Sequence, residues 1–254
     1  MAQTGVVKLW NYETGKLGNW ETVKLRNGQQ MRPLLGLVSI GQSPRPDYIE
    51  AFQPHAPDAE IRVAGALDNL SAEQIEVYAG INGDYPLLVR LADGRPVEID
   101  LSVLAPLVEK QAQELAQAGA RLVVVMCAGG FPDVACTAPV LLPGQILPAV
   151  VKALCRTKTI GVVTPIKGQV DAAKSKWQAD GFQPRVTWAA PHLHHEIETA
   201  AKTMADPSLE VIILDCMGHD ETYRTAFARL CGRPVVLAQS LVARVAGEWV
   251  AGNG

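Results

Sequence analysis

Two cysteines stand at matching places in two similar segments of the 254-residue sequence. In RLVVVMCAGGF and EVIILDCMGHD, a run rich in β-branched residues ends at Cys127 and Cys216, and glycine follows within two residues. In parallel α/β sheets, ligands bind beyond the carboxyl ends of the strands, where helix N-terminal amides are free to hold an anion. One such cysteine is typical of a small apolar residue that closes a buried strand. Two at equivalent places indicate a pair of thiols that face one substrate.

The residues that follow each cysteine are small or apolar. Ala128, Gly129 and Gly130 on one side, and Met217 and Gly218 on the other, carry no bulky polar group that would keep an anion away from the backbone. We expect their amides to stabilise negative charge that develops on a substrate carboxylate. The same amides are expected to lower the pKa of the two thiols.

The other polar residues beside Cys216 allow more than one role. His219 lies three residues after the cysteine, where it would assist the thiol, cap the following helix or lie on the surface. Asp215 directly precedes the cysteine, and alternate residues of a strand point to opposite faces. We therefore expect Asp215 to make a structural hydrogen bond rather than to act as the base.

A second polar group follows the first apolar run of the chain, LLGLVSIG. Gly41, Gln42, Ser43 and Arg45 come directly after this run, at the end of the strand that would face the cleft. The planar guanidinium of Arg45 suits a substrate carboxylate. The alternative is a solvated arginine in a proline-rich turn.

Apolar runs and helical periodicity alternate along most of the sequence, and this pattern predicts the elements that position these residues. Apolar residues at three- and four-residue spacing predict helices over 100–118 and 240–250, and a shorter helix follows the first strand at 48–52. The pattern predicts an α/β fold of buried parallel strands covered by helices. The strands are expected at 34–41, 61–67, 122–126, 160–163, 186–188, 211–214 and 235–238.

Three segments interrupt this alternation. Residues 85–99 alternate around Asp93-Gly94, which is a strong hairpin signal. The proline-rich passage 132–148 indicates a crossing between two domains of similar build. Residues 1–30 are predicted to form an N-terminal arm or hairpin, the alternative being a mobile tail. We assign 31–133 and 234–254 to a first α/β lobe and 134–233 to a second.

Composition excludes several classes of protein. The 23 basic and 26 acidic residues give a net charge of −3, which leaves no footprint for nucleic acid. The longest uncharged stretch, 134–151, contains three prolines and is not a membrane span. The first ten residues lack a secretion signal, and the five cysteines show no CxxC spacing, so we expect a reducing cytoplasm. No glycine-rich nucleotide motif follows the first strand.

Five segments of the sequence carry a resemblance to a known family. LGLVSIGQSPRPD, CAGGF, IGVVTP, LDCMG and RPVVLAQSLVARVAGE are similar to AroM proteins, a branch of the aspartate/glutamate racemase-like superfamily, and the similarity runs from about Leu34 to Val250. The resemblance implies two pseudo-symmetric Rossmann-like lobes, with parallel sheets flanked by helices and one cysteine from each lobe facing the α-carbon of a small carboxylate. Cys127 corresponds to the first cysteine and Cys216 to the second. They are 89 residues apart, somewhat fewer than in racemases.

By this resemblance the chain is a racemase or epimerase that needs neither a cofactor nor a metal. One thiolate removes the α-proton and the opposite thiol delivers one, which requires the sulfurs to face each other about 7 to 9 Å apart. Thr164-Pro165 occupies the place where racemases bind substrate with a small hydroxylic residue. The resemblance implies a small carboxylate as the partner, with no nucleic acid and no membrane, and allows a homodimer.

The same superfamily offers other activities. One cysteine suffices to decarboxylate a malonate-like substrate, and a cysteine nucleophile serves cis-trans isomerisation of maleate. A non-catalytic protein that binds a small molecule is a further alternative, because racemases place asparagine and threonine after the first cysteine and threonine after the second. Ala128-Gly129 and Met217-Gly218 stand there in this sequence.

Overall fold

The computed structural model describes residues 8–11, 16–19, 32–191 and 193–251. By their contacts, residues 1–31 and 32–254 form two separate units. In the first unit, β1 (Lys8–Asn11) pairs antiparallel with β2 (Lys16–Asn19). Apart from these two strands, the predicted N-terminal arm, 1–30, lies outside the described residues.

The first sheet of the second unit contains four parallel strands, in the order β4-β3-β7-β8. Its centre is made of apolar runs: all six residues of β3 are buried, as a parallel strand covered on both faces requires. The strands are β3 (Leu34–Ser39), β4 (Glu60–Gly65), β7 (Ala120–Val125) and β8 (Val140–Leu141).

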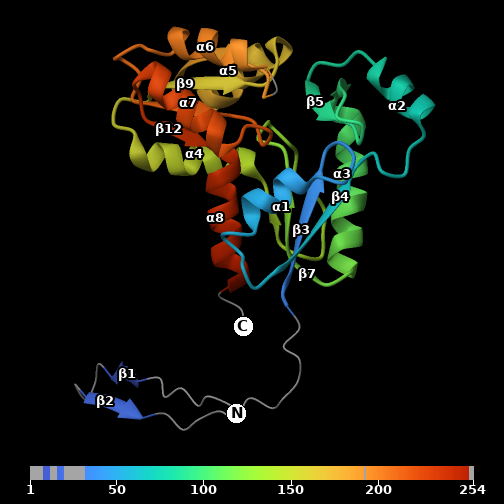
Figure 1. Cartoon of the computed structure of the whole chain (residues 1–254), viewed down its shortest axis with the longest axis vertical. Helices are drawn as coiled ribbons and strands as arrows, with labels where there is room; N and C mark the ends of the chain where they lie inside the picture. Colours follow the sequence, from blue (N-terminus) through green and yellow to red (C-terminus); the bar gives the residue numbers. More distant parts are fainter. Residues whose placement is uncertain (1–7, 12–15, 20–31, 192, 252–254) are drawn as a thin grey trace. The chain divides into compact units, whose positions relative to one another are not determined.

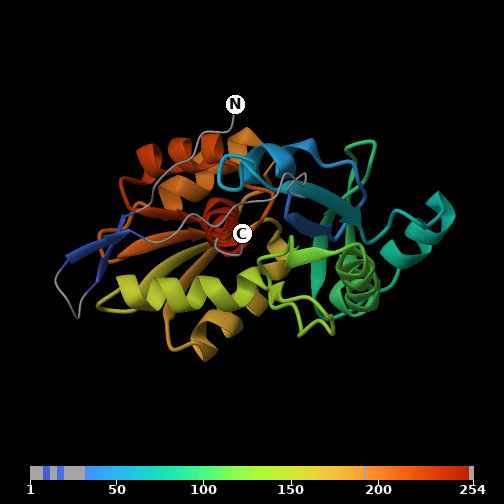
Figure 2. The same ribbon diagram turned by 90° about the horizontal axis from the view of Figure 1, so that it is seen from below.

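The second sheet repeats this plan with the order β10-β9-β11-β12, again parallel throughout. Apolar residues of both sheets share one core, in which Leu37 of β3 and Val162 of β9 are fully buried. Figure 2 shows the two sheets with their helices side by side. The strands are β9 (Thr159–Thr164), β10 (Gln183–Trp188), β11 (Val211–Leu214) and β12 (Val235–Leu237).

Helices cover the faces of both sheets (Figure 1). The longest one, α3, buries Leu104, Val108 and Leu115 at helical spacing, and its N-cap Asp100 accepts the Ser102 amide at 2.9 Å. The helices are α1 (Pro46–Phe52), α2 (Ala72–Ala79), α3 (Leu101–Gln117), α4 (Pro143–Leu154), the 3₁₀ turn η1 (Lys167–Gln169), α5 (Val170–Ala179), α6 (His194–Thr203), α7 (Glu221–Cys231) and α8 (Ala238–Ala251).

The observed elements confirm the predicted α/β class, and the expected hairpin is present as β5 (Pro86–Arg90) and β6 (Pro96–Asp100). The passage 132–148 differs from the expected crossing, because it contains β8 and the start of α4. Pro143 occupies the first turn of that helix, where its missing N–H has no intrahelical partner to lose.

The strands do not follow the predicted lobe boundaries at two places. β8, within 134–233, joins the first sheet, and β12, within 234–254, joins the second. Helix α8 begins directly after β12 and then packs on α1 and on β7 of the first sheet. The division into 31–133 with 234–254 and 134–233 stays a proposal.

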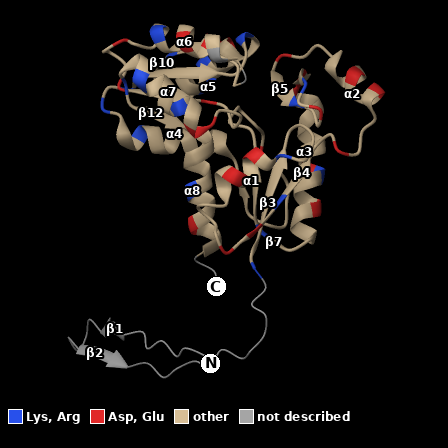
Figure 3. Cartoon of the chain, in the orientation of Figure 1, with Lys and Arg blue, Asp and Glu red and all other residues tan. Residues whose placement is uncertain are grey.

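Basic and acidic residues, coloured blue and red along the ribbon in Figure 3, are interspersed over the described part of the chain. Among the described helices, none combines the length and apolar character needed to cross a membrane.

Candidate active site

A cavity of about 90 Å³ lies where the loops after β3, β7, β9 and β11 meet. Each of these loops contributes a residue that the sequence pointed to, as expected for the carboxyl ends of parallel strands. The predicted residues that line it are Arg45, Cys127, Ala128, Gly129, Pro165, Cys216, Met217 and Gly218.

Cys127 and Cys216 both line this cavity, so the two strand-end cysteines share one site. Burial raises the pKa of Cys127 to about 12 and that of Cys216 to about 11. The amides of Gly129 and Gly218 oppose this, and the Gly218 N–H donates to the Cys216 sulfur at 3.3 Å. The expectation of lowered thiol pKa values is therefore wrong, because desolvation by the surrounding protein outweighs the amides.

Arg45 is buried rather than solvated, with 7% of its surface exposed. Its Nε and Nη2 donate to the two Asp47 oxygens at 2.9 and 2.6 Å. Its guanidinium carbon lies 3.7 Å from the centre of the Tyr48 ring, which also lines the cavity. Asp47 therefore occupies one bidentate face of the group expected to hold a carboxylate.

Gly41, Gln42 and Ser43 do not line the cavity, and the first two lie against the β5–β6 hairpin. The backbone N–H of Gln42 donates to the Arg90 carbonyl at 3.1 Å, and its side-chain Oε1 accepts the backbone N–H of Ala92 at 3.0 Å. A Cβ at Gly41 would lie 2.2 Å from the Arg90 oxygen, so this close approach requires glycine. Ser43 is engaged by Asp68, through its amide at 2.7 Å and its hydroxyl at 2.8 Å.

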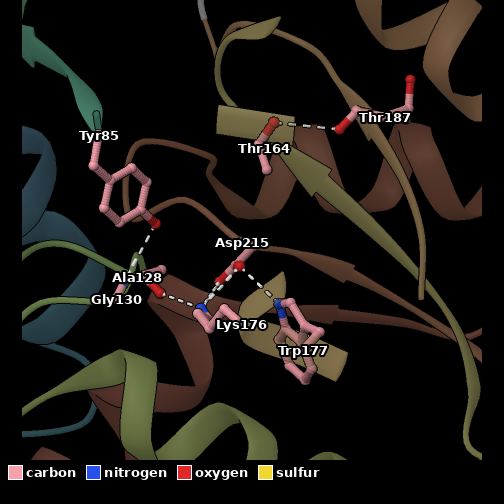
Figure 4. A network of polar contacts seen from close by, with 8 residues as sticks. All are labelled: Tyr85, Ala128, Gly130, Thr164, Lys176, Trp177, Thr187 and Asp215. Atoms are coloured by element: carbon pink, nitrogen blue, oxygen red, sulfur yellow. Dashed lines mark hydrogen bonds and ion pairs between the residues drawn. The ribbon is translucent and has the colours of Figure 1, made fainter. Parts of the chain in front are cut away.

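Three further predicted residues, Gly130, Thr164 and His219, do not line the cavity. The Gly130 amide donates to the Tyr85 hydroxyl at 3.1 Å (Figure 4). The Thr164 hydroxyl donates to the Ile166 carbonyl at 3.0 Å, within the turn after β9. His219 is fully buried and bonds the Ala189 carbonyl at 3.0 Å. It is therefore neither a surface residue nor the helix cap, which is Asp220.

The β5–β6 hairpin forms a part of the site that the sequence did not predict. Leu87, Leu88, Val89 and Arg90 line the cavity together with Gln169 of η1. Gln169 donates its Nε2 to the Pro86 carbonyl at 2.8 Å, and this bond joins the hairpin to the turn that follows the second sheet's β9. The alternation of residues 85–99 predicted the hairpin, but no local signal placed it over the cysteines.

The family model described as AroM protein matches residues 35–250. The chain belongs to the AroM family. A search of curated proteins gave no match.

Solved structures with this fold are distant in sequence from the AroM-family chain. A double mutant of arylmalonate decarboxylase in its liganded form is 14% identical, covers 87% of this chain and 94% of its own, and has a TM-score of 0.57. A structure described as a putative Asp/Glu racemase from Yersinia pestis is 16% identical, with 86% and 99% covered and a TM-score of 0.55. A glutamate racemase isoform from Bacillus anthracis is 12% identical, with 87% and 83% covered and a TM-score of 0.58. These similarities confirm the Asp/Glu racemase-like fold.

Lys176 links the two cysteine loops of this AroM protein (Figure 4). Its ammonium donates to the Ala128 carbonyl at 2.8 Å and to Asp215 at 3.0 Å, so it touches the residue after one cysteine and the residue before the other. Trp177 also donates to Asp215, at 2.9 Å. The structural hydrogen bonds expected of Asp215 are confirmed, while the lysine was not foreseen.

His219 is held neutral by its surroundings. Burial lowers its pKa to about 4, despite the hydrogen bond to Ala189. Because Nε2 lies against a carbonyl oxygen, it carries the proton of the neutral ring, and Nδ1 has no partner among the described residues. The ring stacks on Tyr223, with 4.2 Å between centres. The geometry therefore assigns His219 to the support of the Cys216 loop.

We expect this histidine to make stability pH-dependent. Its folded pKa of about 4 lies below the value of 6.5 in an unfolded chain, so the unfolded chain binds more protons between these values. Through His219 alone, the free energy of unfolding is highest above pH 6.5. It falls by about 3 kcal/mol as the pH decreases from 6.5 to about 4. Urea unfolding at a series of pH values measures this.

The matched variants isolate the effect of His219. His219→Phe is expected to flatten the dependence between about pH 4 and 6.5, whatever it does to stability at neutral pH. His195→Gln, which replaces an exposed histidine of α6, is the control variant. An unaltered slope in the phenylalanine variant would contradict the assignment.

Proposed function

We propose that this protein is a cofactor-independent isomerase that exchanges the proton at the α-carbon of a small carboxylate, as a racemase or epimerase. The observation that carries the proposal is that Cys127 and Cys216, each two residues beyond a strand of a different sheet, line one cavity. Two thiols around one cavity suit a reaction in which one face of a carbon loses a proton and the other gains one.

In the proposed reaction, the thiolate of one cysteine takes the α-proton and the electron pair of the C–H bond passes into the carboxylate. The thiol of the other cysteine then gives its proton to the opposite face, and it is left as the thiolate. The charges of Lys176 near Cys127 and of Arg45 near Cys216 favour the thiolates, whereas the carboxylate of Asp215 opposes both, at Cys216 more strongly than Arg45 favours it. Arg45, which lines the cavity, also favours negative charge on the substrate. The sulfurs are predicted to lie about 7 to 9 Å apart around a bound substrate.

The raised pKa values set a requirement on this mechanism. With pKa values of about 12 and 11, both cysteines are thiols in the free protein at neutral pH. Forming one thiolate costs several kcal/mol, which becomes part of the barrier. Once formed, a thiolate of high pKa is a strong base, which suits an α-proton of low acidity. No metal or pyridoxal phosphate is needed in this scheme, because the thiols carry the protons and the cations stabilise the charge.

Decarboxylation is the second candidate reaction. It is supported by the fold shared with arylmalonate decarboxylase and by the raised thiol pKa values, because protonation of a carbanion needs a thiol and not a thiolate. A binding protein without turnover is supported by the absence of hydroxyl and amide side chains directly after the cysteines. In each case the ligand is a small carboxylate.

The five free cysteines support a reducing, cytoplasmic location.

Exchange with deuterated solvent tests the proposal. Amino acids, hydroxy acids and hydantoins are incubated with the protein in D₂O, and incorporation at the α-carbon is read by mass spectrometry. Incorporation that disappears in Cys127→Ala supports proton exchange and contradicts the binding-only alternative. Release of CO₂ from a substituted malonate, without exchange into any of the other compounds, would establish the decarboxylase instead.

A further inference from the structure

The cavity contains a guanidinium that the proposed reaction does not use. Arg90 lies at the end of β5, is exposed, and lines the cavity together with the cysteines. Its side chain makes no hydrogen bond or ion pair with any residue of 32–191 and 193–251. Arg45 differs, because two of its nitrogens bond Asp47. Arg90 is therefore the arginine of the cavity whose donors are open to an anion.

The backbone of Arg90 is held firmly on two sides. The backbone N–H of Gln42 donates to the Arg90 carbonyl at 3.1 Å. A Cβ atom at Gly41 would lie 2.2 Å from the same carbonyl oxygen. At the start of β5, Gln169 bonds the Pro86 carbonyl at 2.8 Å. The Gly41-Gln42 pair thus serves the site by fixing the strand that carries Arg90, and a preformed position lowers the entropy cost of binding.

The carboxylates around the cavity are already engaged. Asp215, which lines it, accepts hydrogen bonds from Lys176 and Trp177. Asp47 is bonded by Arg45 at 2.6 Å. A substrate ammonium would need a carboxylate or several acceptors in place of its water shell. Within the described residues, the cavity therefore offers one guanidinium without a hydrogen-bonded partner, although its charge also acts on Asp47, and no acidic group without such a partner.

Most of the remaining lining is apolar. Ile40, Leu88, Met126, Pro165, Pro191 and Met217 contribute side chains without charge. A second charged group of a ligand would lose its hydration against this surface, whereas an alkyl group gains from burial.

We propose that Arg90 binds the substrate carboxylate, and that the site takes monocarboxylates with a neutral α-substituent and an apolar side chain rather than free amino acids or dicarboxylates. This inference rests on the proposed function for the identity of the cavity as the reacting site. It assigns to the hairpin both the anchor and part of the specificity of the reaction.

Direct binding tests the inference separately from turnover. The probes are 2-hydroxy-3-methylbutanoate, its amide, valine and 2-hydroxybutanedioate, measured by ligand-observed NMR with the full chain. We expect the hydroxy acid to bind at least about tenfold more tightly than the other three compounds. Equal binding of valine, or no binding of the hydroxy acid at millimolar concentration, would overturn the inference.

Variants of the hairpin locate the anchor. Arg90→Gln is expected to weaken binding of the hydroxy acid by about tenfold or more, with Arg90→Lys intermediate because lysine keeps the charge but not the fork. Arg95→Gln is the matched control: Arg95 lies in the turn of the same hairpin and pairs with Glu76 at 2.9 Å, and it does not line the cavity. The affinity of the Arg95→Gln variant for the hydroxy acid should be unchanged.

The two proposals fail in different ways. Binding that depends on Arg90, together with no deuterium exchange in any compound, would support this assignment and remove the racemase. Exchange that depends on the cysteines but is the same in Arg90→Gln would support the racemase and overturn the role of Arg90. Thermal unfolding of each variant shows that a loss of binding is not a loss of folding.

Discussion

Replacing Cys127 or Cys216 with serine is expected to remove most of the racemisation and to leave each variant able to exchange the proton of one enantiomer. Each cysteine lines the cavity from the end of a different sheet, and in the proposed mechanism each serves one face of the α-carbon. Removing one thiol deletes the base for one enantiomer and the acid for the other. We expect racemisation to fall by about 10²- to 10⁴-fold, the usual contribution of a positioned acid or base.

The surviving thiolate can still remove a proton and return a deuteron on its own side. The two variants should therefore exchange opposite enantiomers, which chiral chromatography with mass spectrometry resolves. Cys155→Ser is the matched control, since Cys155 lies at the end of α4 and does not line the cavity. If both variants exchange the same enantiomer, or if either racemises at the full rate, the two-thiol mechanism is wrong.

Much of the fold could be predicted because the central strands are buried on both faces. Such a strand must be apolar along its whole length, and β3, β7 and β11 show this as continuous runs. Helix α4 was missed because Pro143, Gly144 and Pro148 read as a loop. Proline costs little in the first turn of a helix, and the apolar side of α4 supplies the packing energy that the sequence pattern alone does not show.

The candidate site could be predicted only where it depends on strand ends. The two cysteines follow from the rule that loops after parallel strands meet, and both line the cavity. The position of the β5–β6 hairpin at the cavity could not be predicted, because the hydrogen bond from Gln169 to Pro86 that holds it joins residues 83 positions apart. The lysine between the cysteine loops contacts Asp215 across 39 positions. Periodicity carries no information about either contact.

The direction of the thiol pKa shift shows the same limit. Amides after each cysteine can be read from the sequence, and they do act on the sulfurs. Desolvation depends on how much protein surrounds the thiol, which is a property of the assembled fold. The sequence therefore indicates the smaller effect, by which the amides lower the thiol pKa, and not the larger effect of burial, which raises it.

The pair of Lys176 and Asp215 is expected to give the largest effect on stability. The Asp215 side chain is 3% exposed and that of Lys176 15%, so both charges have lost most of their water. Lys176→Met would leave the carboxylate with Trp177 as its remaining side-chain donor and would also free the Ala128 carbonyl. Breaking a buried pair from one side costs about 3 to 5 kcal/mol. Urea unfolding at neutral pH measures the loss.

The double variant separates the pair from the lysine's other contacts. In Lys176→Met with Asp215→Leu, no unpaired charge stays buried, so we expect a large part of the lost stability to return. Lys174→Met, on the exposed side of the same helix, should change stability by less than about 0.5 kcal/mol. If Lys176→Met is as stable as this control, the ammonium does not hold the two loops together. If it is destabilised and the double variant is not, the charge pair, and not the length of the lysine chain, fixes the distance between the two cysteine loops.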